Sequence, residues 1–475
     1  MGDFGARLAE PNTLVWQGQR LLINEAPFTC TFAQQPIPMR TRLVLLSLLF
    51  AGTTFAQVQP VVMLGPVTMT EATIWVQCKT DCQAFVAFSD TSDRNATPHT
   101  VERATASDSE ASVMVFRLSG LQPGHTYQYN VVTKDVVPAS TLQPRPYEFT
   151  TQPLWQWRTD PPEFTVAMGS CNYVNEEAHD RPGKPYGGDY QIYNSIADKG
   201  PDVMLWLGDN IYLREPDWDS RSGMVHRYEH TRAMPEMQRL LTSASNYAIW
   251  DDHDFGPNDG DRSFVHAETS RELFRLFWPN PTPEQHGVGG VGTQFSYGDV
   301  DFFLLDDRSF RTRTDLKSDS LTILGKAQID RLIEGLKASK APFKMLAIGG
   351  QFLSTAAVFE NYANYATERA AIIDRIQREG IKGVVFLTGD RHFTELSRLE
   401  LPDGNVIHDL TVSPLTSTAY DPKEDNTLRV EGTRVGQRNF ATLTFSGKRN
   451  ERSMLINVFD SDGKLLWERR IDQPK

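Results

Sequence analysis

Residues 250–259 read WDDHDFGPND and hold four aspartates, one histidine and one asparagine. They directly follow the apolar residues 247–249, which predict a buried strand. Carboxylates this dense repel one another and resist burial unless a positive charge holds them together. Aspartate oxygens and an imidazole nitrogen are ordinary ligands of metal ions. The stretch therefore predicts a metal site at a strand end, with a solvated acidic loop that caps a helix as the alternative.

Four other apolar segments of the C-terminal part also run into polar residues: 164–168, 202–207, 344–348 and 383–388. Side chains at the carboxyl ends of strands converge in open α/β sheets. Any one of these ends is explained by a simple turn, but together they predict one shared metal site. The polar residues at the five strand ends are Cys171, Asp209, Asp252 with His253, Gln351, and Asp390 with His392.

Helical patterns lie between the apolar segments and predict an α/β layout with a buried sheet. They cover residues 189–199, 224–242, 270–277, 325–339 and 365–379. The tail differs, because residues 440–445 and 454–459 alternate like strands. The turn at 460–463 then predicts a hairpin with residues 465–471.

The N-terminal part is β in character. Short strands over 73–77, 84–88, 112–118 and 147–150 predict an immunoglobulin-like or fibronectin-like sandwich, and residues 121–131 add a Pro-Gly turn that leads into an alternating strand. Tyr127 follows a turn at the place where such sandwiches carry a corner tyrosine. Cys78 and Cys82 flank a short turn, and both a disulfide and two reduced thiols fit this spacing. We expect a sandwich over residues 57–151, a Pro- and Trp-bearing linker over 152–162, and a second domain over 163–475.

Composition narrows the classes of protein and partner. With 475 residues, the chain is long enough for two domains. Its formal charge of -12 argues against a nucleic-acid-binding module, since phosphate backbones select basic surfaces. No apolar run reaches the length of a membrane span, so we expect no transmembrane anchor. We expect a monomer.

Residues 39–56 have the pattern of a secretory signal peptide. The basic segment MRTR precedes the apolar run 43–50, and the small residues 54–56 suit a cleavage site before Gln57. A buried core helix is the alternative. Residues 1–38 are then an upstream extension from an earlier start codon. The pattern predicts export by the Sec-type route to the periplasm or the outside of the cell.

Four motifs together resemble the PhoD-like alkaline phosphatases, a branch of the calcineurin-like metallophosphoesterases. They are GSC at 169–171, LGDNIY at 207–212, WDDHD at 250–254 and TGDRHF at 388–393. The resemblance covers nearly the whole mature chain. It implies an α/β/β/α sandwich with a multinuclear metal site that hydrolyses phosphate esters. The implied metals are Fe(3+) and Ca(2+), with Zn(2+), Mn(2+) or Mg(2+) as alternatives.

The resemblance also implies roles for single residues. Asp209 matches the bridging carboxylate, and His253 either binds metal or donates a proton. Apart from the resemblance, Asn210, Asn258 and Arg391 are candidates to hold a phosphate oxygen, with a structural role as the alternative for each. The implied metal ligands are Cys171, Asp209, Tyr212, Asp252, Asp390 and His392.

The donor types agree with this chemistry. Thiolate and phenolate are good donors to ferric iron, and carboxylates suit calcium. Two close cations turn a water into the nucleophile, so no protein nucleophile is needed. The twin-arginine signal of many relatives is absent, because Thr41 separates Arg40 from Arg42. Metal is then loaded after export.

Two further functions stay open at this stage. A phosphodiesterase or phospholipase can use the same site, especially because the tail predicts a hairpin in place of a capping helix. A catalytically inactive surface binding protein is the third interpretation.

His226, His230 and His266 lie in charged helical surroundings, so we expect them to be surface residues.

Overall fold

The structure is a computed structural model that describes residues 60–78, 83–93, 97–103, 111–133, 146–281, 288–317, 321–421 and 423–475. The predicted extension (1–38) and signal peptide (39–56) lie outside these residues. Cys78 is disulfide-bonded. Its predicted partner Cys82 is not among the described residues, so this pairing stays a prediction. No helix of the described chain is long and apolar enough to cross a membrane.

Residues 61–150 contain two antiparallel sheets that face each other across one apolar core. The first sheet has the order β1 (Val61–Val67), β2 (Glu71–Gln77) and β5 (Val113–Ser119). The second has the order β4 (His99–Arg103), β3 (Ala84–Asp90), β6 (Thr126–Thr133) and β7 (Tyr147–Thr150). The Tyr127 hydroxyl accepts a hydrogen bond of 2.8 Å from the backbone N–H of Gln122, which confirms the predicted corner tyrosine.

Two six-stranded sheets lie in the part of the structure that follows residue 163. The first sheet has the order β10 (Ser245–Ile249), β9 (Val203–Leu207), β8 (Phe164–Gly169), β17 (Asn439–Ser446), β18 (Ser453–Asp460) and β19 (Leu465–Asp472). The second has the order β11 (Thr293–Tyr297), β12 (Val300–Leu304), β13 (Lys344–Ala347), β14 (Val384–Thr388), β16 (Val406–Thr411) and β15 (Glu395–Glu400). Strands β8, β9 and β10 run parallel, and so do β12, β13, β14 and β16.

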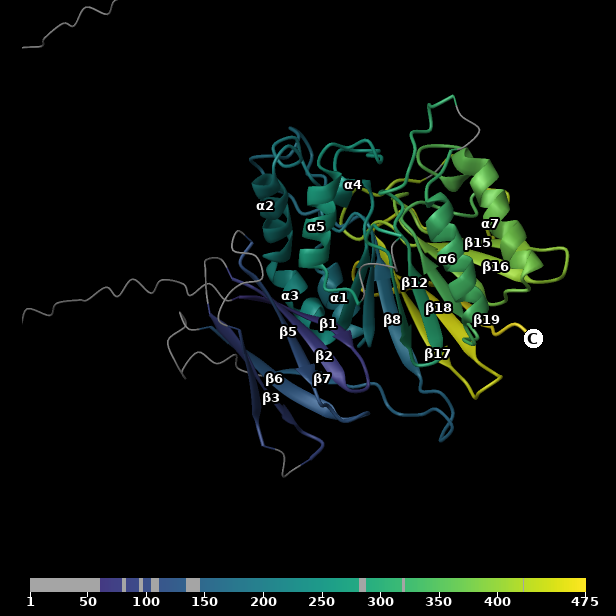
Figure 1. The fold of residues 1–475 in the computed structure, drawn as a ribbon. Coiled ribbons are helices and arrows are strands. Elements are labelled where there is room, and N and C mark those ends of the chain that lie inside the picture. Colours follow the sequence, from purple (N-terminus) through teal and green to yellow (C-terminus); the bar gives the residue numbers. More distant parts are fainter. Residues whose placement is uncertain are drawn as a thin grey trace, which may run out of the picture. The chain divides into compact units, whose positions relative to one another are not determined.

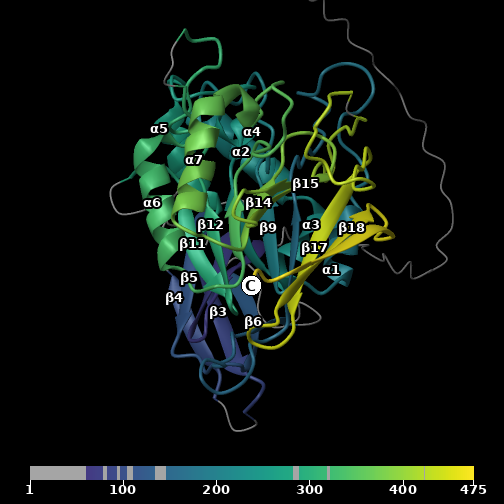
Figure 2. The same cartoon turned by 90° about the vertical axis from the view of Figure 1, so that its right-hand side faces the viewer.

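The two sheets pack face to face, and helices cover their outer faces (Figure 1; Figure 2). One layer contains α1 (Ile192–Asp198), α2 (Arg221–Arg232), α3 (Pro235–Ser243) and α5 (Ala267–Phe277). The other contains α6 (Gly325–Ala338) and α7 (Ala366–Arg378). Because apolar side chains cover both faces of each sheet, the central strands read as continuous apolar runs, as VMLWL does in β9. The expected α/β/β/α sandwich is confirmed.

The helix predicted over residues 224–242 is wrong in one respect, because the structure has two helices there. Helix α2 ends at Arg232, and α3 begins at Pro235. Met234 has φ -59° and ψ 120°, which is outside the helical region. A proline disfavours the helical conformation in the residue before it and suits the first position of a helix. Pro235 therefore separates the two helices.

Replacement of Phe445 tests the core between the two sheets. This side chain on β17 is fully buried, and its ring centroid lies 4.9 Å from that of Phe164 and 5.8 Å from that of Phe343. We expect Phe445→Ala to lower the free energy of unfolding by about 3 to 5 kcal/mol, because it leaves a cavity. Urea unfolding measures the loss. Val265→Ala, at a side chain 85% exposed, should stay within about 0.5 kcal/mol of wild type.

Candidate metal centre

The parallel strands bring their polar ends together at one edge of the two sheets. Cys171 follows β8, Asp209 follows β9, and α4 (Asp252–Phe255) follows β10. The loops are tied by backbone hydrogen bonds, since Cys171 N donates to Gly208 O at 3.2 Å and Gly389 N donates to Gly349 O at 2.6 Å. A third bond joins the two sheets, because Leu415 N, after β16, donates to Ser170 O, after β8, at 2.8 Å. Loops from both sheets therefore meet at this edge.

Glycine lets these loops approach closely. A Cβ on Gly208, which has φ +87°, would stand 2.7 Å from Cβ of Asp251. A Cβ on Gly389 would stand 2.6 Å from the side chain of Ser170. Both separations are too short for a side chain. The two glycines therefore let the acidic loops lie against their neighbours.

Four site residues have left-handed backbone conformations. Their φ angles are 57° for Cys171, 50° for Asp209, 64° for Asp390 and 55° for His392. Such conformations cost on the order of 1 to 3 kcal/mol each and gather at functional sites. Each produces a sharp turn at the end of a strand, which aims the side chain at the shared edge.

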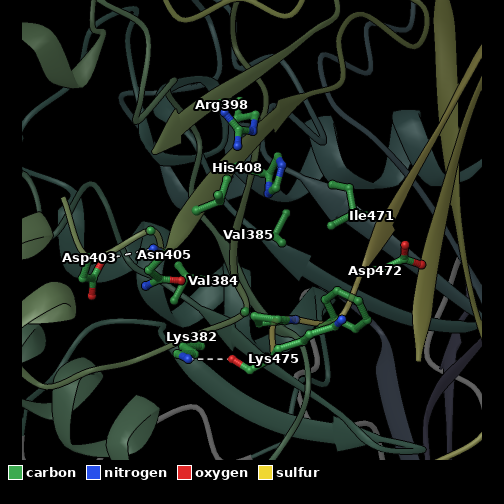
Figure 3. A pocket seen from close by; sticks show the side chains of 15 residues that line it. Lys382, Val384, Val385, Arg398, Asp403, Asn405, His408, Ile471, Asp472 and Lys475 are labelled. Carbon is green, nitrogen blue, oxygen red and sulfur yellow. Dashed lines mark hydrogen bonds between the residues drawn. The ribbon is translucent and has the colours of Figure 1, made fainter. Parts of the chain in front are cut away.

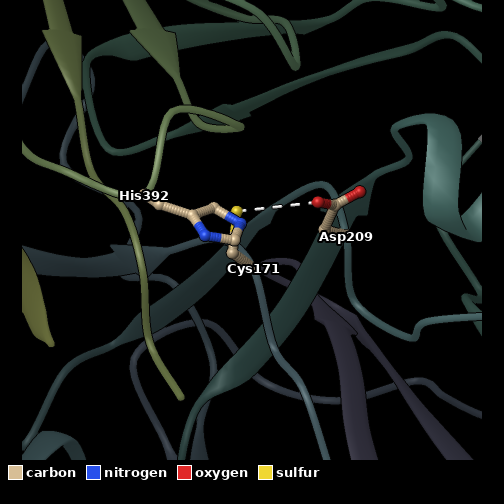
Figure 4. Close-up of side chains that lie close together, drawn as sticks. All are labelled: Cys171, Asp209 and His392. Atoms are coloured by element: carbon tan, nitrogen blue, oxygen red, sulfur yellow. Dashed lines mark hydrogen bonds between the residues drawn. The ribbon is translucent and has the colours of Figure 1, made fainter. Parts of the chain in front are cut away.

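The first ligand group contains Cys171, Asp209 and His392, whose ligand atoms all lie within 4.8 Å of one another (Figure 4). The Cys171 Sγ lies 3.6 Å from Asp209 Oδ2 and accepts a hydrogen bond from the Ser413 hydroxyl at 3.1 Å. Burial and the charges of Asp209 and Asp390 raise the pKa of the Cys171 thiol. A bound cation would oppose this shift and favour the thiolate.

The second group contains Asp209, Asp252 and His253, with the same limit of 4.8 Å between ligand atoms. Asp209 belongs to both groups, so its carboxylate stands where two cations can share it. Asp252 is held by two backbone N–H donors, His253 at 2.9 Å and Asp259 at 2.7 Å. The Nδ1 of His253 is buried and has no hydrogen-bond partner among the described residues. This orphaned nitrogen fits a ligand to a cation.

The third group joins Asp251, Asp252 and Glu360. Here the protein supplies its own cation, because the buried Arg308 guanidinium pairs with Asp251 and with Glu360, the latter at 2.8 Å. Asp251 also accepts from the N–H of Asp252 at 3.0 Å. An arginine thus neutralises the inner side of the acidic cluster.

The buried carboxylates of the site shift one another's pKa values. Burial and the charges of Asp252 and Asp251 raise the pKa of Asp209 well above its ordinary value. Burial raises the pKa of Asp390 to about 7, although Arg391 opposes the shift. Burial also acts on Asp252, but the charges of His253 and Arg308 outweigh it and lower the pKa to about 2. Cations between these groups would relieve the repulsion.

Tyr212 lies beside both histidines. Its hydroxyl is 3.3 Å from His392 Nε2, and its ring centroid is 4.2 Å from that of His253. His392 Nδ1 lies 2.6 Å from the carbonyl of Thr418 and is suited to donate to it, which directs Nε2 toward the site. Burial and the charge of Asp209 raise the pKa of Tyr212. The donor set of thiol, phenol, imidazoles and carboxylates fits one or more metal ions.

Three predicted residues have other environments. Asn210 is buried and donates its amide to the carbonyl of Ile249 at 2.8 Å, while its Oδ1 has no partner among the described atoms. Arg391 is buried, pairs with Glu424 and donates to the Tyr420 hydroxyl at 3.0 Å. Asn258 is exposed. Their substrate contacts stay predictions.

Gln351, at the fourth strand end, is tied into the second sheet. It donates to Glu395 at 2.9 Å and to Thr411 at 3.0 Å. Sequence reasoning did not single out Arg308 or Glu360. Residues 305–308 (LDDR) directly follow β12, so the same strand-end argument applies to Arg308. Glu360 lies in an irregular loop and carries no comparable signal.

The cavity in Figure 3 lies at the opposite edge of the second sheet. It has a volume of about 420 Å³ and is lined by residues near the amino ends of β14 and β16, including Val384 and His408. Asp390 and its neighbours follow the carboxyl ends of the same strands. This cavity is therefore not part of the metal centre.

Two facing sheets, a helical layer on each side and ligands gathered at one edge define the metallophosphoesterase fold. More narrowly, the chain belongs to the PhoD-like phosphatase family, because the family profile described as "PhoD-like phosphatase" matches residues 166–455. A second profile, described as a domain of unknown function (DUF7800), matches residues 60–148.

Individual relatives agree with this family. The chain is 22% identical over 331 residues to "Alkaline phosphatase D" of Bacillus subtilis (strain 168). That match covers 59% of this chain and 53% of the relative, so the chain spans about half the length of this curated relative.

Two solved structures share the fold. One is described as "Structure of PhoD", with 18% identity, a TM-score of 0.68 and coverage of 87% of this chain and 92% of that one. The other is a purple acid phosphatase, PPD1, from yellow lupin (Lupinus luteus) seeds. It has 13% identity, a TM-score of 0.64 and coverage of 87% and 74%.

Metal-free protein should lose stability as pH rises from about 4 to about 7. Burial raises the pKa of Asp390 from 3.8 to about 7 and that of Asp254 also to about 7. In this window the folded state binds more protons than the unfolded state, so the free energy of unfolding falls with pH, by on the order of a few kcal/mol. Urea unfolding of chelator-treated protein at several pH values measures the slope.

Asp390→Asn supplies the control, because it removes one of these titrations. The metal-free variant should show a flatter decline than metal-free wild type. Metal-loaded wild type should also show a flatter decline, since bound cations keep the carboxylates charged. An identical pH dependence in all three samples would contradict the repulsion described here.

Proposed function

We propose that this chain is a metal-dependent phosphoesterase that hydrolyses phosphate monoesters with water as the nucleophile. One observation carries the proposal: Asp209 belongs to two ligand groups that lie side by side at the edge of the sheets. Membership of the PhoD-like phosphatase family supports it. A carboxylate shared by two ligand groups can hold two neighbouring cations together, as a two-metal hydrolytic site needs.

The two groups differ in their donors, and this suggests a different cation for each. Cys171 and His392 of the first group supply thiolate and imidazole, and Tyr212, whose hydroxyl lies 3.3 Å from His392 Nε2, would add a phenolate; these donors suit Fe(3+). Asp252 of the second group supplies carboxylate oxygens, which suit Ca(2+), and Asp390, which lies outside the three ligand groups, would add another carboxylate. Asp209 would bridge the two positions. When bound, the cations supply Lewis acidity, which neutralises the negative charge of the phosphoryl oxygens and lowers the pKa of the attacking water.

The protein's own groups then orient the reactants and move the proton. Burial lowers the pKa of His253, although the charge of Asp252 opposes the shift. A neutral imidazole fits a metal ligand or a proton acceptor better than a proton donor. Arg214 adds a positive charge nearby, because its guanidinium lies 4.1 Å from the ring centroid of Tyr173 and 5.6 Å from that of Tyr212. We infer that Arg214 helps to attract the anionic ester.

Arg391 has a different part in this proposal. Its guanidinium is committed to Glu424 and Tyr420, so it holds the loop that carries Asp390 and His392.

Export by the signal peptide at 39–56 also belongs to the proposal. The disulfide-bonded state of Cys78 supports an oxidising compartment. Metal loading would then follow export.

A phosphodiesterase or phospholipase is the second candidate, and the rim of the site favours it. Tyr186 is 39% exposed, and its hydroxyl lies 3.4 Å from His392 Nδ1. Phe359 is 71% exposed, and its ring centroid lies 4.6 Å from the Arg391 guanidinium. Exposed aromatic surface beside the ligands suits a second organic group on the phosphorus. Rates on matched aryl phosphate mono- and diesters separate the two functions.

Asp209→Asn should abolish metal binding and activity together. The amide keeps the size of the side chain but removes the charge that both ligand groups share. We expect hydrolysis of p-nitrophenyl phosphate to fall by several orders of magnitude, and elemental analysis to show a loss of metal. Asp219→Asn, at an exposed position, should behave like wild type. A wild-type rate in Asp209→Asn would refute the proposed site, whereas metal-free wild-type protein would favour an inactive binding protein.

Tyr212→Phe tests the identity of the first cation. A phenolate on ferric iron absorbs visible light, so purified wild-type protein should be coloured and Tyr212→Phe should be colourless or strongly blue-shifted. Tyr173→Phe is the matched control, because Tyr173 packs beside Tyr212, at 5.0 Å between ring centroids, but donates its hydroxyl to Asp180. Equal visible spectra for wild type and Tyr212→Phe would exclude this tyrosine as an iron ligand.

A further inference from the structure

We propose that Glu176, His179 and His226 form a second metal site, which binds one zinc ion and shares no residue with the strand-end cluster. The proposal does not depend on the phosphoesterase activity. One ligand atom from each of the three side chains lies within 4.8 Å of the other two. Two imidazoles with one glutamate form a known ligand set for zinc.

The local fold explains how the three side chains meet. Glu176 and His179 belong to one turn of backbone, in which His179 N donates to Glu176 O at 2.8 Å. His226 projects from α2 toward the same carboxylate. Its Nε2 lies 2.9 Å from Glu176 Oε1, and the Nε2 of His179 lies 3.8 Å from the same oxygen.

These separations are close to those that zinc requires. Ligand atoms about 2.0 to 2.1 Å from a tetrahedral zinc ion lie about 3.3 Å from one another. A bound ion would pull the nearest pair slightly apart and draw the other pair together. The two imidazole planes meet at 85°, with ring centroids 6.0 Å apart, so the rings do not stack on each other. Water can complete the coordination, because the side chains of His179 and His226 are 33% and 47% exposed.

The glutamate is fixed in the orientation that a metal ligand needs. Its second oxygen, Oε2, pairs with the buried Arg227 guanidinium at 2.9 Å, and Arg227 in turn pairs with the buried Asp217 at 2.8 Å. Burial alone would raise the pKa of Glu176, but the hydrogen bond with His226 and the charge of Arg227 hold it below its ordinary value. The Oε1 atom therefore faces the two imidazoles as a charged, oriented donor.

A neighbouring histidine has a different task. His230 lies one turn further along α2, with its ring centroid 6.2 Å from that of His226, and its Nε2 is 3.0 Å from the carbonyl of Asn175. It therefore ties the same loop to α2 without a metal. Zinc would add a second tie. The loop leads back to Tyr173, whose ring packs against Tyr212, and so the zinc site would brace one wall of the catalytic centre.

Zinc uptake by the full-length protein with its catalytic metals in place tests the proposal. Wild type, His226→Ala, His179→Ala and Glu176→Gln are equilibrated with zinc chloride, desalted and subjected to elemental analysis. We expect wild type to retain one more zinc per chain than each variant, while the other metals stay equal in all four. His266→Ala, a histidine outside the cluster, should match wild type.

Thermal unfolding gives an independent readout. Zinc should raise the Tm of wild type and His266→Ala by a few degrees and leave the three variants unchanged, because a ligand stabilises only a protein that binds it. Equal Tm values without zinc would show that the variants fold normally. Equal zinc uptake by wild type and the variants would overturn the proposal. Loss of phosphatase activity in an Asp209 variant would not affect this outcome.

Discussion

The mutual repulsion of buried carboxylates is the constraint on which this structure depends. Asp209, Asp251 and Asp390 stand at one edge of two packed sheets, where burial deprives them of water. The protein relieves part of this repulsion internally, because Arg308 lies between Asp251 and Glu360. Asp209 and Asp390 have no comparable arginine in the described ion pairs. Bound cations would supply the positive charge that these two carboxylates lack.

The backbone around the cluster fits this interpretation. The left-handed residues at the strand ends have a conformational cost that an ordinary loop avoids, because an ordinary loop can form relaxed turns. The same holds for the closely packed glycines beside them. At this edge they aim several donors at a small volume. Bound cations would offset this cost in conformational free energy, so their removal should weaken the folded state.

Much of the architecture could be predicted because burial leaves a clear trace in sequence. Strands covered on both faces are continuous apolar runs, and the polar residue after each run identifies the functional edge. The helix break at Pro235 was not predicted, because one apolar periodicity runs through both helices. Glu360 was missed because only tertiary packing brings its loop to the cluster. His226 is exposed, as expected, but its contact with Glu176 was not predicted, because Glu176 lies 50 positions upstream and no local pattern connects the two residues.

Strand β8, which precedes Cys171, pairs with one strand that is close to it in the sequence and with one that is near the C-terminus. Strand β8 pairs with β9 on one side and with β17 on the other, where Met168 is opposite Ala441. A ribosome must therefore synthesise nearly the entire polypeptide before β8 gains its second neighbour. Until then only β8, β9 and β10 of the first six-stranded sheet can pair. The order of strands thus makes the support beneath Cys171 one of the last parts of that sheet to form.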